Sequence, residues 1–563
     1  MAGEGSSVPA VFDRSVPVVR LAGEDTVVAV IRAERVGSRL DAVRARLAVR
    51  YGGVLDDARV HSAVLADDVA LLVVGGGGPV NADAVHVWGT AWAATGPATD
   101  AEVRAIVAEP VRARELTGRF VVVGRAAETI RLLTSTDVVH SLKHAEVDGV
   151  DAWATRGLAA LTVVDRPVAL NSSAIAEYLL FDFVLDGEEL TSGVRQVEEA
   201  TCIDIDIGRV RSASYWSRAE RLAPGPPTTP VGLRAAITAA VVPVAAGEGA
   251  ALGLTAGRDS LLVASCLADA GAAMAAFTMG DPSWPDAVGA LAVCAALGWP
   301  HARTVPSVSA RPSFAEAVRW SAWTEGLVLA RDVIGPPLGG LASVRSVLSG
   351  SGGEIGRAVW WAGPAAAVGW RSSFVAPATA ELAPAPAAHV GARVEAALAS
   401  LPAADDARRL DQLYAFGRMR GWLARGRPLA GVAGTTAAYL SPGVVRALLD
   451  LPDDRRADAS AFDEAIALGS RDLRGIAADA VSAARARRSL LRRARGHFFP
   501  PVSGEVATLE LMLGQAGESL DAARAAVGDR FWDHARRTAA TSTRSRLTLW
   551  NAVSLAALVV SET

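Results

Sequence analysis

The chain has 563 residues, 51% of them hydrophobic and 21% charged, which is enough for two or more domains with large cores. Its net charge of −4 argues against the basic surface that binds a nucleic-acid backbone or an anionic membrane. The three cysteines, Cys202, Cys266 and Cys294, are too widely spaced for a zinc or disulfide pattern. Because no signal peptide or bilayer-length apolar run is evident, we expect a cytoplasmic protein without a membrane span or nucleic-acid partner.

Residues 1–220 are predicted to form one strand-rich α+β domain. Residues 1–100 mix candidate strands with a helical stretch at 38–53, and residues 100–215 are short, often alternating apolar runs separated by Gly, Asp and Asn. The segment 221–232, RLAPGPPTTPVG, concentrates proline and is the predicted linker.

Residues 233–563 begin with alternating strands and helices. Apolar runs at 249–255, 272–279 and 343–350 indicate strands, while 260–271 and 283–298 indicate helices. Repeated strand–helix units predict a parallel sheet, whose ligands lie beyond the carboxyl ends of the strands. Residues 380–563 are expected to be mainly helical.

The segment LTAGRDS, Leu254 to Ser260, joins a predicted strand to a predicted helix. Small residues at that position expose backbone N–H groups and the positive end of a helix dipole, which favour a phosphate or pyrophosphate. The segment matches neither a Walker loop nor a dinucleotide fingerprint.

A second glycine-rich turn follows a later strand. VLSGSGGEIGR, residues 347–357, presents one carboxylate, Glu354. Because Asp259 and Glu354 each lie just past a predicted parallel strand, we expect them to share a Mg²⁺ that bridges ATP phosphates. Taken singly, each of them also fits a solvated loop acid.

The two segments together resemble the nucleotide motifs of the asparagine synthetase family, which commonly read SGGxDS and LSGxGxDE. Gly257, Asp259 and Ser260 match the first motif, whereas Thr255 and Ala256 replace its Ser and Gly. The stretch FTMGDPSWPDAVGALAVCAALGWPH is similar to the family's segment between the motifs.

The resemblance implies an α+β N-terminal β-sandwich domain of the Ntn (N-terminal nucleophile) type at 1–220. It implies a parallel-sheet α/β ATP-pyrophosphatase (PP-loop) domain with a helical C-terminal part at 233–563. The cofactors would be ATP and Mg²⁺, the latter held by Asp259 and Glu354. The residues that the resemblance places around the nucleotide are Leu254, Thr255, Ala256, Gly257, Arg258, Asp259, Ser260, Met279, Ser349, Gly350, Gly352 and Gly353.

Three departures from the family pattern bear on mechanism. No cysteine precedes Cys202, so the N-terminal domain lacks the nucleophile that hydrolyses glutamine. The single lysine, Lys143, lies in the same domain, so an arginine must replace the family's catalytic lysine, and the candidates are Arg485, Arg487 and Arg488. These arginines equally fit an exposed basic helix face. Ser351 takes the position at which relatives place a group that helps to deprotonate the amine, yet a hydroxyl is a poor base.

Family members without the glutaminase cysteine include β-lactam synthetases and the cyclases that build lasso peptides. The altered motifs favour a cyclase that adenylates an Asp or Glu side chain of a precursor peptide and joins it to the peptide's N-terminal amine. Its partners would be that peptide, a leader-peptide-binding protein and a leader peptidase. The alternatives are a β-lactam synthetase-like or other amide ligase acting on a small acid, and a non-catalytic scaffold that binds a nucleotide or a peptide.

Overall fold

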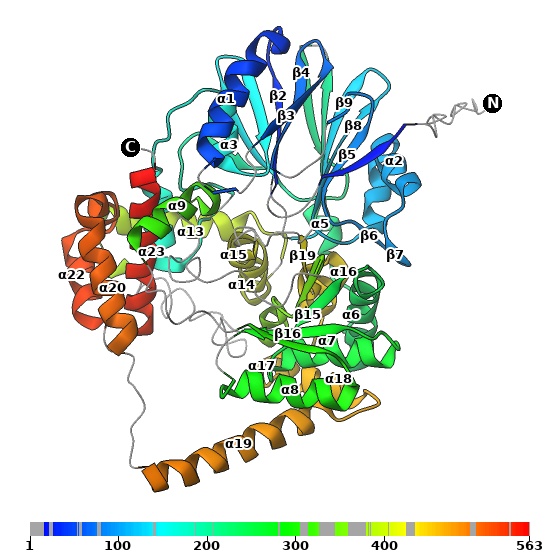
Figure 1. The fold of residues 1–563 in the computed structure, drawn as a ribbon, viewed down its shortest axis with the longest axis vertical. Helices are drawn as coiled ribbons and strands as arrows, with labels where there is room; N and C mark the ends of the chain where they lie inside the picture. The colour runs from blue at the N-terminus through cyan, green and yellow to red at the C-terminus, as the bar shows by residue number, and fades with distance from the viewer. Residues whose placement is uncertain are drawn as a thin grey trace.

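The computed structural model of the protein describes residues 16–21, 26–52, 54–55, 59–75, 80–138, 142–185, 187–206, 208–279, 282–304, 313–325, 344–358, 379–380, 382, 384–403, 405–423, 434–495, 503–539 and 542–561 (Figure 1). Within these ranges it is a mixed α/β structure with several sheets, as the sequence predicted. None of the helices described in these ranges is long and apolar enough to cross a membrane.

Two sheets form the N-terminal part (Figure 1). The first has the order β1 (Val18–Leu21), β5 (Val85–Gly89), β8 (Phe120–Ala126), β9 (Thr129–Thr134), β13 (Thr201–Asp206) and β14 (Arg209–Ser214). The second has the order β12 (Val194–Gln196), β10 (Lys143–Val147), β11 (Val150–Ala154), β2 (Val27–Arg32), β4 (Val69–Val74) and β3 (Val60–Ala66). A short hairpin of β6 (Trp92–Ala93) and β7 (Gly96–Pro97) follows β5 in the sequence and precedes the helix at Asp100–Ala108.

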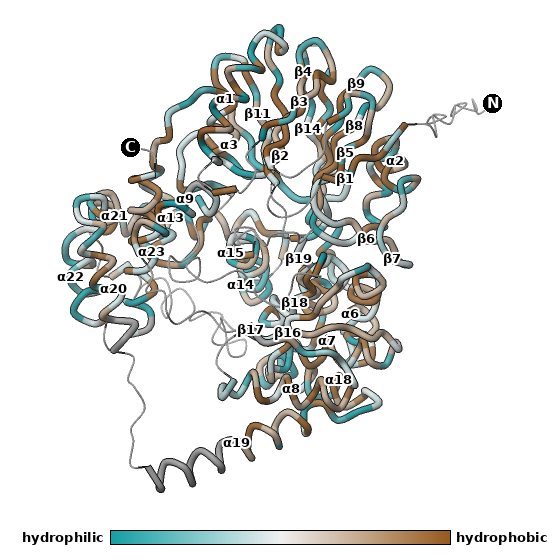
Figure 2. Tube along the Cα trace, in the orientation of Figure 1, coloured by the Kyte–Doolittle hydropathy of each residue, from teal (hydrophilic) through white to brown (hydrophobic). Residues whose placement is uncertain are grey.

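The central strands β2 and β4 are almost wholly apolar because both of their faces are buried, whereas the edge strand β14 is polar and largely exposed (Figure 2). In β2, Val28 and Val30 point into the core between the sheets, together with Val121 of β8. Val27, Ala29 and Ile31 of β2 point the other way, toward the helices α1 (Leu40–Tyr51) and α3 (Gly157–Val163). The helix α2 (Asp100–Ala108) covers the outer face of the first sheet. The predicted β-sandwich is therefore present, with helices outside it.

A third sheet follows the predicted linker 221–232. The first residue of that segment ends α5 (Arg218–Arg221), and its last three residues begin α6 (Pro230–Ala245). The strands of this sheet are all parallel, in the order β17 (His301–Thr304), β16 (Ala275–Met279), β15 (Ala250–Gly253), β18 (Ser346–Ser349) and β19 (Gly434–Ala437). The helices around its core are α6, α7 (Arg258–Asp269), α8 (Pro285–Leu297), α16 (Pro442–Leu449), α18 (Ser460–Ala467) and α19 (Leu473–Arg495). The short α17 (Asp453–Ala457) contacts α18.

The remaining helices share a separate apolar core. It contains residues of α9 (Phe314–Thr324), α13 (Pro384–Ala399), α14 (Asp406–Leu413), α20 (Ser503–Ala516), α21 (Asp521–Val527), α22 (Asp529–Thr538) and α23 (Thr543–Ser561). The helix α4 (Ser172–Phe181) also belongs to this core, although its residues fall within the predicted N-terminal domain. The C-terminal helices therefore pack directly against a segment from the first half of the chain.

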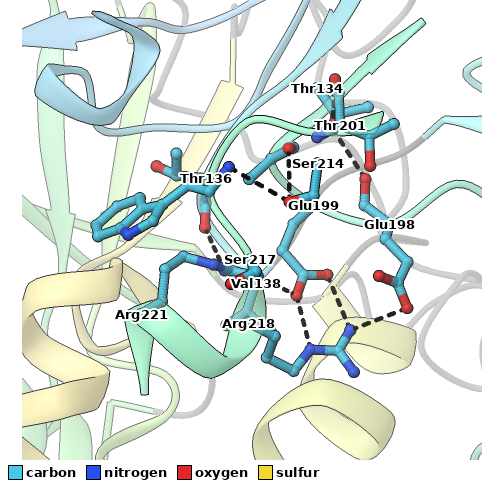
Figure 3. A network of polar contacts seen from close by, with 12 residues as sticks. Thr134, Thr136, Val138, Glu198, Glu199, Thr201, Ser214, Ser217, Arg218 and Arg221 are labelled. Atoms are coloured by element: carbon cyan, nitrogen blue, oxygen red, sulfur yellow. Dashed lines mark hydrogen bonds and ion pairs between the residues drawn. The ribbon is translucent and has the colours of Figure 1, made fainter. Parts of the chain in front are cut away.

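A buried ion-pair network joins the sandwich to the rest of the protein, and Figure 3 shows the part of it around Glu199, Arg218 and Arg221. The Glu199 side chain is fully buried, and its carboxylate accepts hydrogen bonds from Arg218 Nε at 2.9 Å and Arg221 Nη2 at 2.5 Å. Arg420, the first residue of α15 (Arg420–Leu423), is its third cationic partner. Trp92 of β6 adds a hydrogen bond to Thr436 of β19, at 3.2 Å. The two halves of the chain are thus held together by buried polar contacts as well as apolar packing.

Candidate functional site

The two glycine-rich segments meet because their strands are neighbours. β15 and β18 pair in parallel, with Gly253 opposite Ser349, so both chains leave the sheet at the same edge. The first segment then enters α7, and the second enters the short 3₁₀ helix η3 (Gly353–Arg357). This is the edge at which parallel α/β sheets bind ligands.

The first loop is closed by its own hydroxyl groups. Thr255 Oγ1 accepts a hydrogen bond from Gly257 N at 3.0 Å and lies 3.0 Å from Ser260 Oγ. Ser260 Oγ also accepts from Thr255 N at 3.1 Å. The threonine that departs from the family motif thus still supplies a hydroxyl, and the loop leads directly into the N-terminus of α7, whose first N–H groups have no partner within the helix.

Glycines of the second segment allow it to touch the first. A Cβ on Gly350 would lie 2.9 Å from Ser260 N, and one on Gly353 would lie 2.4 Å from Asp259 Cγ. Gly352 has a φ of +97°, which L residues rarely adopt, and packs on Leu440. The glycines at these positions are therefore required by close approach and backbone conformation.

Asp259 and Glu354 are brought together, with Arg357 between them. Arg357 Nη2 lies 2.7 Å from Asp259 Oδ2 and 3.8 Å from Glu354 Oε1. Burial raises the pKa of Asp259 to about 6, an effect that Arg357 opposes and Glu354 reinforces. Tyr439 donates a hydrogen bond from its hydroxyl to the backbone carbonyl of Asp259, at 2.8 Å.

Asp259 and Glu354 are a donor set of the kind that would suit a Mg²⁺ ion. Asp259 Oδ1 is buried and has no hydrogen-bond partner among the described residues. The missing Cβ of Gly353, which would lie 2.5 Å from that oxygen, lets the Asp259 carboxylate lie directly against the second segment. The described residues contain no cluster of three or more potential ligands, and Mg²⁺ characteristically takes one or two carboxylates and completes its shell with phosphate oxygens and water.

Other predicted site residues have more limited roles. The Arg258 guanidinium points to Asp463 of α18, and its Nε lies 2.7 Å from Asp463 Oδ1. Arg258 would therefore contact a ligand in the loop through its backbone N–H. The Leu254 side chain is fully buried in the core, and its carbonyl accepts from Thr278 Oγ1 at 2.7 Å. Met279 ends β16, but its side chain lies outside the described residues.

The structure says less about the roles of Ser351 and the three candidate catalytic arginines. Ser351 Oγ lies 2.7 Å from Ser349 Oγ, and Ser351 N donates to the same hydroxyl at 3.2 Å. Arg485, Arg487 and Arg488 belong to α19, but their side chains lie outside the described residues. Their role stays a prediction.

The sequence interpretation did not include Arg357, Tyr439 or Asp463 in the site. Arg357 had a usable signal, because it follows Glu354 by three residues and so lies one helical turn away. Tyr439 and Asp463 come from distant segments, and nothing local in the sequence indicates what they contact.

The N-terminal domain shows no thiol suited to glutamine hydrolysis among its described residues. Cys202 lies within β13, where burial raises the pKa of its thiol to about 12, whereas nucleophilic cysteines need a lowered pKa. Lys143 is also unavailable as a catalytic cation because its ammonium is buried against Glu189.

No family model and no curated protein matches the chain. Among solved structures, the chain is similar to the allosteric regulatory enzyme of purine biosynthesis, with 10% identity and a TM-score of 0.24 over 51% of this chain and 82% of that one. It is also similar to glutamine phosphoribosylpyrophosphate amidotransferase from B. subtilis complexed with ADP and GMP, with 8% identity and a TM-score of 0.22 over 50% of this chain and 80% of that one. TM-scores this low do not establish a common fold.

Proposed function

We propose that this protein is an ATP-dependent, AMP-forming carbon–nitrogen ligase that closes a macrolactam in a precursor peptide. The observation that carries the proposal is the pairing of Asp259 and Glu354, from two neighbouring parallel strands, beside the N-terminus of α7. A phosphate chain at a helix N-terminus beside two carboxylates is the arrangement needed for nucleotide–metal binding.

The residues would divide the binding task between them. Backbone N–H groups from Gly257 to Ser260 bind and orient the pyrophosphate part of ATP, aided by the dipole of α7. Asp259 and Glu354 hold Mg²⁺, which when bound supplies charge neutralisation at the phosphates. The hydroxyls of Thr255 and Ser260 keep the loop in the shape that presents its N–H groups.

The reaction consists of two displacements. An oxygen of an Asp or Glu side chain in the peptide bonds to the α-phosphorus of ATP, and the bond from that phosphorus to pyrophosphate breaks. The N-terminal amine then bonds to the acyl carbon, AMP departs with the electrons of the broken C–O bond, and the amine gives up its proton. A leader-peptide-binding protein and a leader peptidase would deliver the peptide with a free amine.

The test is to incubate the purified protein with Mg·ATP and candidate precursor peptides and to separate the nucleotides by chromatography. We expect AMP and pyrophosphate, together with a peptide product lighter by one water. A peptide with Asn or Gln in place of the acceptor acid should support neither. Formation of ADP and phosphate would refute the ligase mechanism, and AMP formation with a small acid alone would favour an amide ligase of the β-lactam synthetase type.

Site variants connect the activity to the described geometry. Asp259→Asn and Glu354→Gln each remove one metal-binding charge and are expected to lower turnover at least a hundredfold. Glu464→Gln is the matched control, because Glu464 lies in the same half of the chain in an exposed pair with Arg455. Near-normal activity in both site variants would place the nucleotide elsewhere, and nucleotide binding without any turnover would favour the scaffold alternative.

A further inference from the structure

A cation of the protein itself occupies the space between the two carboxylates. Arg357 extends from η3, and its Nη2 atom is near both Asp259 Oδ2 and Glu354 Oε1, at 2.7 and 3.8 Å. The three side chains are 26%, 17% and 33% exposed, respectively, so the group is partly shielded from water. Arg357 Nε is buried and has no hydrogen-bond partner among the described residues.

The position of Arg357 makes it a competitor of a divalent ion. A guanidinium on Asp259 Oδ2 and a metal on the same carboxylate would bring two positive charges close together, so each weakens the binding of the other. A bound metal would therefore favour the release of Arg357. The released guanidinium, with its permanent charge and forked donors, would be left next to the phosphates that the metal brings.

We propose that Arg357 is the phosphate-binding cation of this site: it neutralises Asp259 and Glu354 in the nucleotide-free protein and moves to the nucleotide phosphates when Mg·ATP binds. This inference rests on the proposed ATP-binding function. Arg357, within the segment 347–357, would then supply the positive charge that a lysine supplies in the asparagine synthetase family. Arg258, the other arginine in these two segments, is held by Asp463 at 2.7 and 3.3 Å.

The first test measures metal binding without nucleotide. Mn²⁺ is titrated into the full-length protein and free Mn²⁺ is followed by electron paramagnetic resonance. Arg357→Ala and Arg357→Gln should bind Mn²⁺ at least about tenfold more tightly than the wild type, because the competing cation is gone. Arg357→Lys should remain within about threefold of the wild type. Arg455→Ala, which removes an exposed arginine in the same half of the chain, should change nothing.

The second test measures ATP binding by calorimetry. Arg357→Ala and Arg357→Gln should bind Mg·ATP at least about tenfold more weakly, in the direction opposite to their effect on Mn²⁺. In the presence of EDTA, Asp259→Asn should bind ATP more tightly than the wild type, because it frees Arg357 for the phosphates. Adding Arg357→Gln to Asp259→Asn should remove that gain. The double variant removes both charges of the Arg357–Asp259 ion pair, so neither charge is left unpaired. It can therefore be used for this test if the single neutral variants fail to fold.

The outcomes separate this inference from the proposed function. If neutral substitution of Arg357 leaves Mn²⁺ and Mg·ATP affinities unchanged while the protein still forms AMP, the role of Arg357 is wrong and the ligase stands. If the wild type binds no ATP and forms no AMP, the proposed function fails, and a change in Mn²⁺ affinity then reports only that Arg357 masks the carboxylates. Tighter Mn²⁺ binding with unchanged ATP binding would overturn the transfer of Arg357 to phosphate.

Discussion

Individual residues of the site are fixed by how closely the two segments approach. Gly353 has no room for a side chain, because a Cβ would lie 2.4 Å from Asp259 Cγ and 2.5 Å from its Oδ1. Any substitution there must move the carboxylate or the turn. The glycine thus sets the position of Asp259 as directly as Arg357 does.

We predict that Gly353→Ala weakens Mg·ATP binding by at least about tenfold, because the new methyl group displaces Asp259, at a packing cost of about 1–3 kcal/mol. Calorimetric titration with Mg·ATP measures the effect. Gly391→Ala, in α13, is the control, since nothing lies within 4 Å of the added methyl group. It should leave binding unchanged and raise or preserve the melting temperature. Equal ATP affinities in the two variants would mean that Asp259 does not bind the nucleotide's metal.

A second residue-scale prediction concerns Asp137, which is buried and interacts electrostatically with Arg221. Its Oδ2 accepts a hydrogen bond from Gly118 N at 3.1 Å, while Oδ1 has no partner among the described residues. Burial raises the pKa of Asp137 to about 7, although Gly118 and Arg221 lower it. The folded protein therefore holds this proton more tightly than the unfolded chain does.

Stability contributed by this group is complete below the unfolded pKa and is lost as the pH rises to about 7. Asp137→Asn keeps a neutral acceptor and should remove that loss. Relative to the wild type, the variant should gain on the order of 3–4 kcal/mol in unfolding free energy above pH 7 and nothing near pH 3. Urea unfolding at several pH values measures this, with fully exposed Asp41→Asn as the control. A wild-type-like pH profile in Asp137→Asn would contradict the prediction.

The sequence predicted that Asp259 and Glu354 belong to the site, but it did not predict the ion pairs that the residues of the site form. Asp259 and Glu354 each follow a strand of a predicted parallel sheet, and this local pattern was enough to predict that they approach each other. The ion pair with Arg357 and the turning of Arg258 toward Asp463 depend on packing between segments far apart in the chain. Such contacts are decided by tertiary structure, which residue type and spacing alone do not encode.

At the scale of elements, the βα units from β15 to α8 and the strand β18 were predictable, whereas the strands β17 and β19 were not. The helix expected at 260–271 is Arg258–Asp269, and the strand expected at 272–279 is Ala275–Met279. β19 has only four residues, GTTA, within a region expected to be mainly helical. It is a strand because it pairs with β18, and a run that short carries no periodic signal of its own.

The loop element before α7 depends on a hydroxyl at position 255. Thr255→Val keeps the shape of the side chain but removes the acceptor for Gly257 N and the contact with Ser260 Oγ. At about 1 kcal/mol for each of the two hydrogen bonds, Mg·ATP affinity should fall by about thirtyfold. Thr255→Ser, the matched control, should stay within about twofold. Unchanged affinity in Thr255→Val would show that the loop keeps its shape without this hydroxyl.

At the scale of the whole molecule, the sandwich is bound to the rest of the chain by charges that are largely buried. Glu199 is fully buried and serves three arginines, and burial lowers the pKa values of Arg221 and Arg420 to about 10. Arg221 also donates to the carbonyl of Thr136 at 3.1 Å, and Arg420 Nε donates to that of Val138 at 3.3 Å. Such a junction would suit an N-terminal domain whose task is to support the C-terminal half of the chain.

We predict that Glu199→Gln uncouples the two halves. Removing the carboxylate's charge leaves Arg218, Arg221 and Arg420 close together without their common counter-ion, and breaking a buried pair in this way costs about 3–5 kcal/mol. We expect a lower first melting transition in calorimetry, and faster limited proteolysis between the sandwich and α6. The neighbouring Glu198→Gln is the matched control: Glu198 is 67% exposed and lies 3.7 Å from Arg218, so its loss should cost less than about 1 kcal/mol. If both variants melt together with the wild type, apolar packing alone joins the halves, and the Glu199 network contributes nothing to their association.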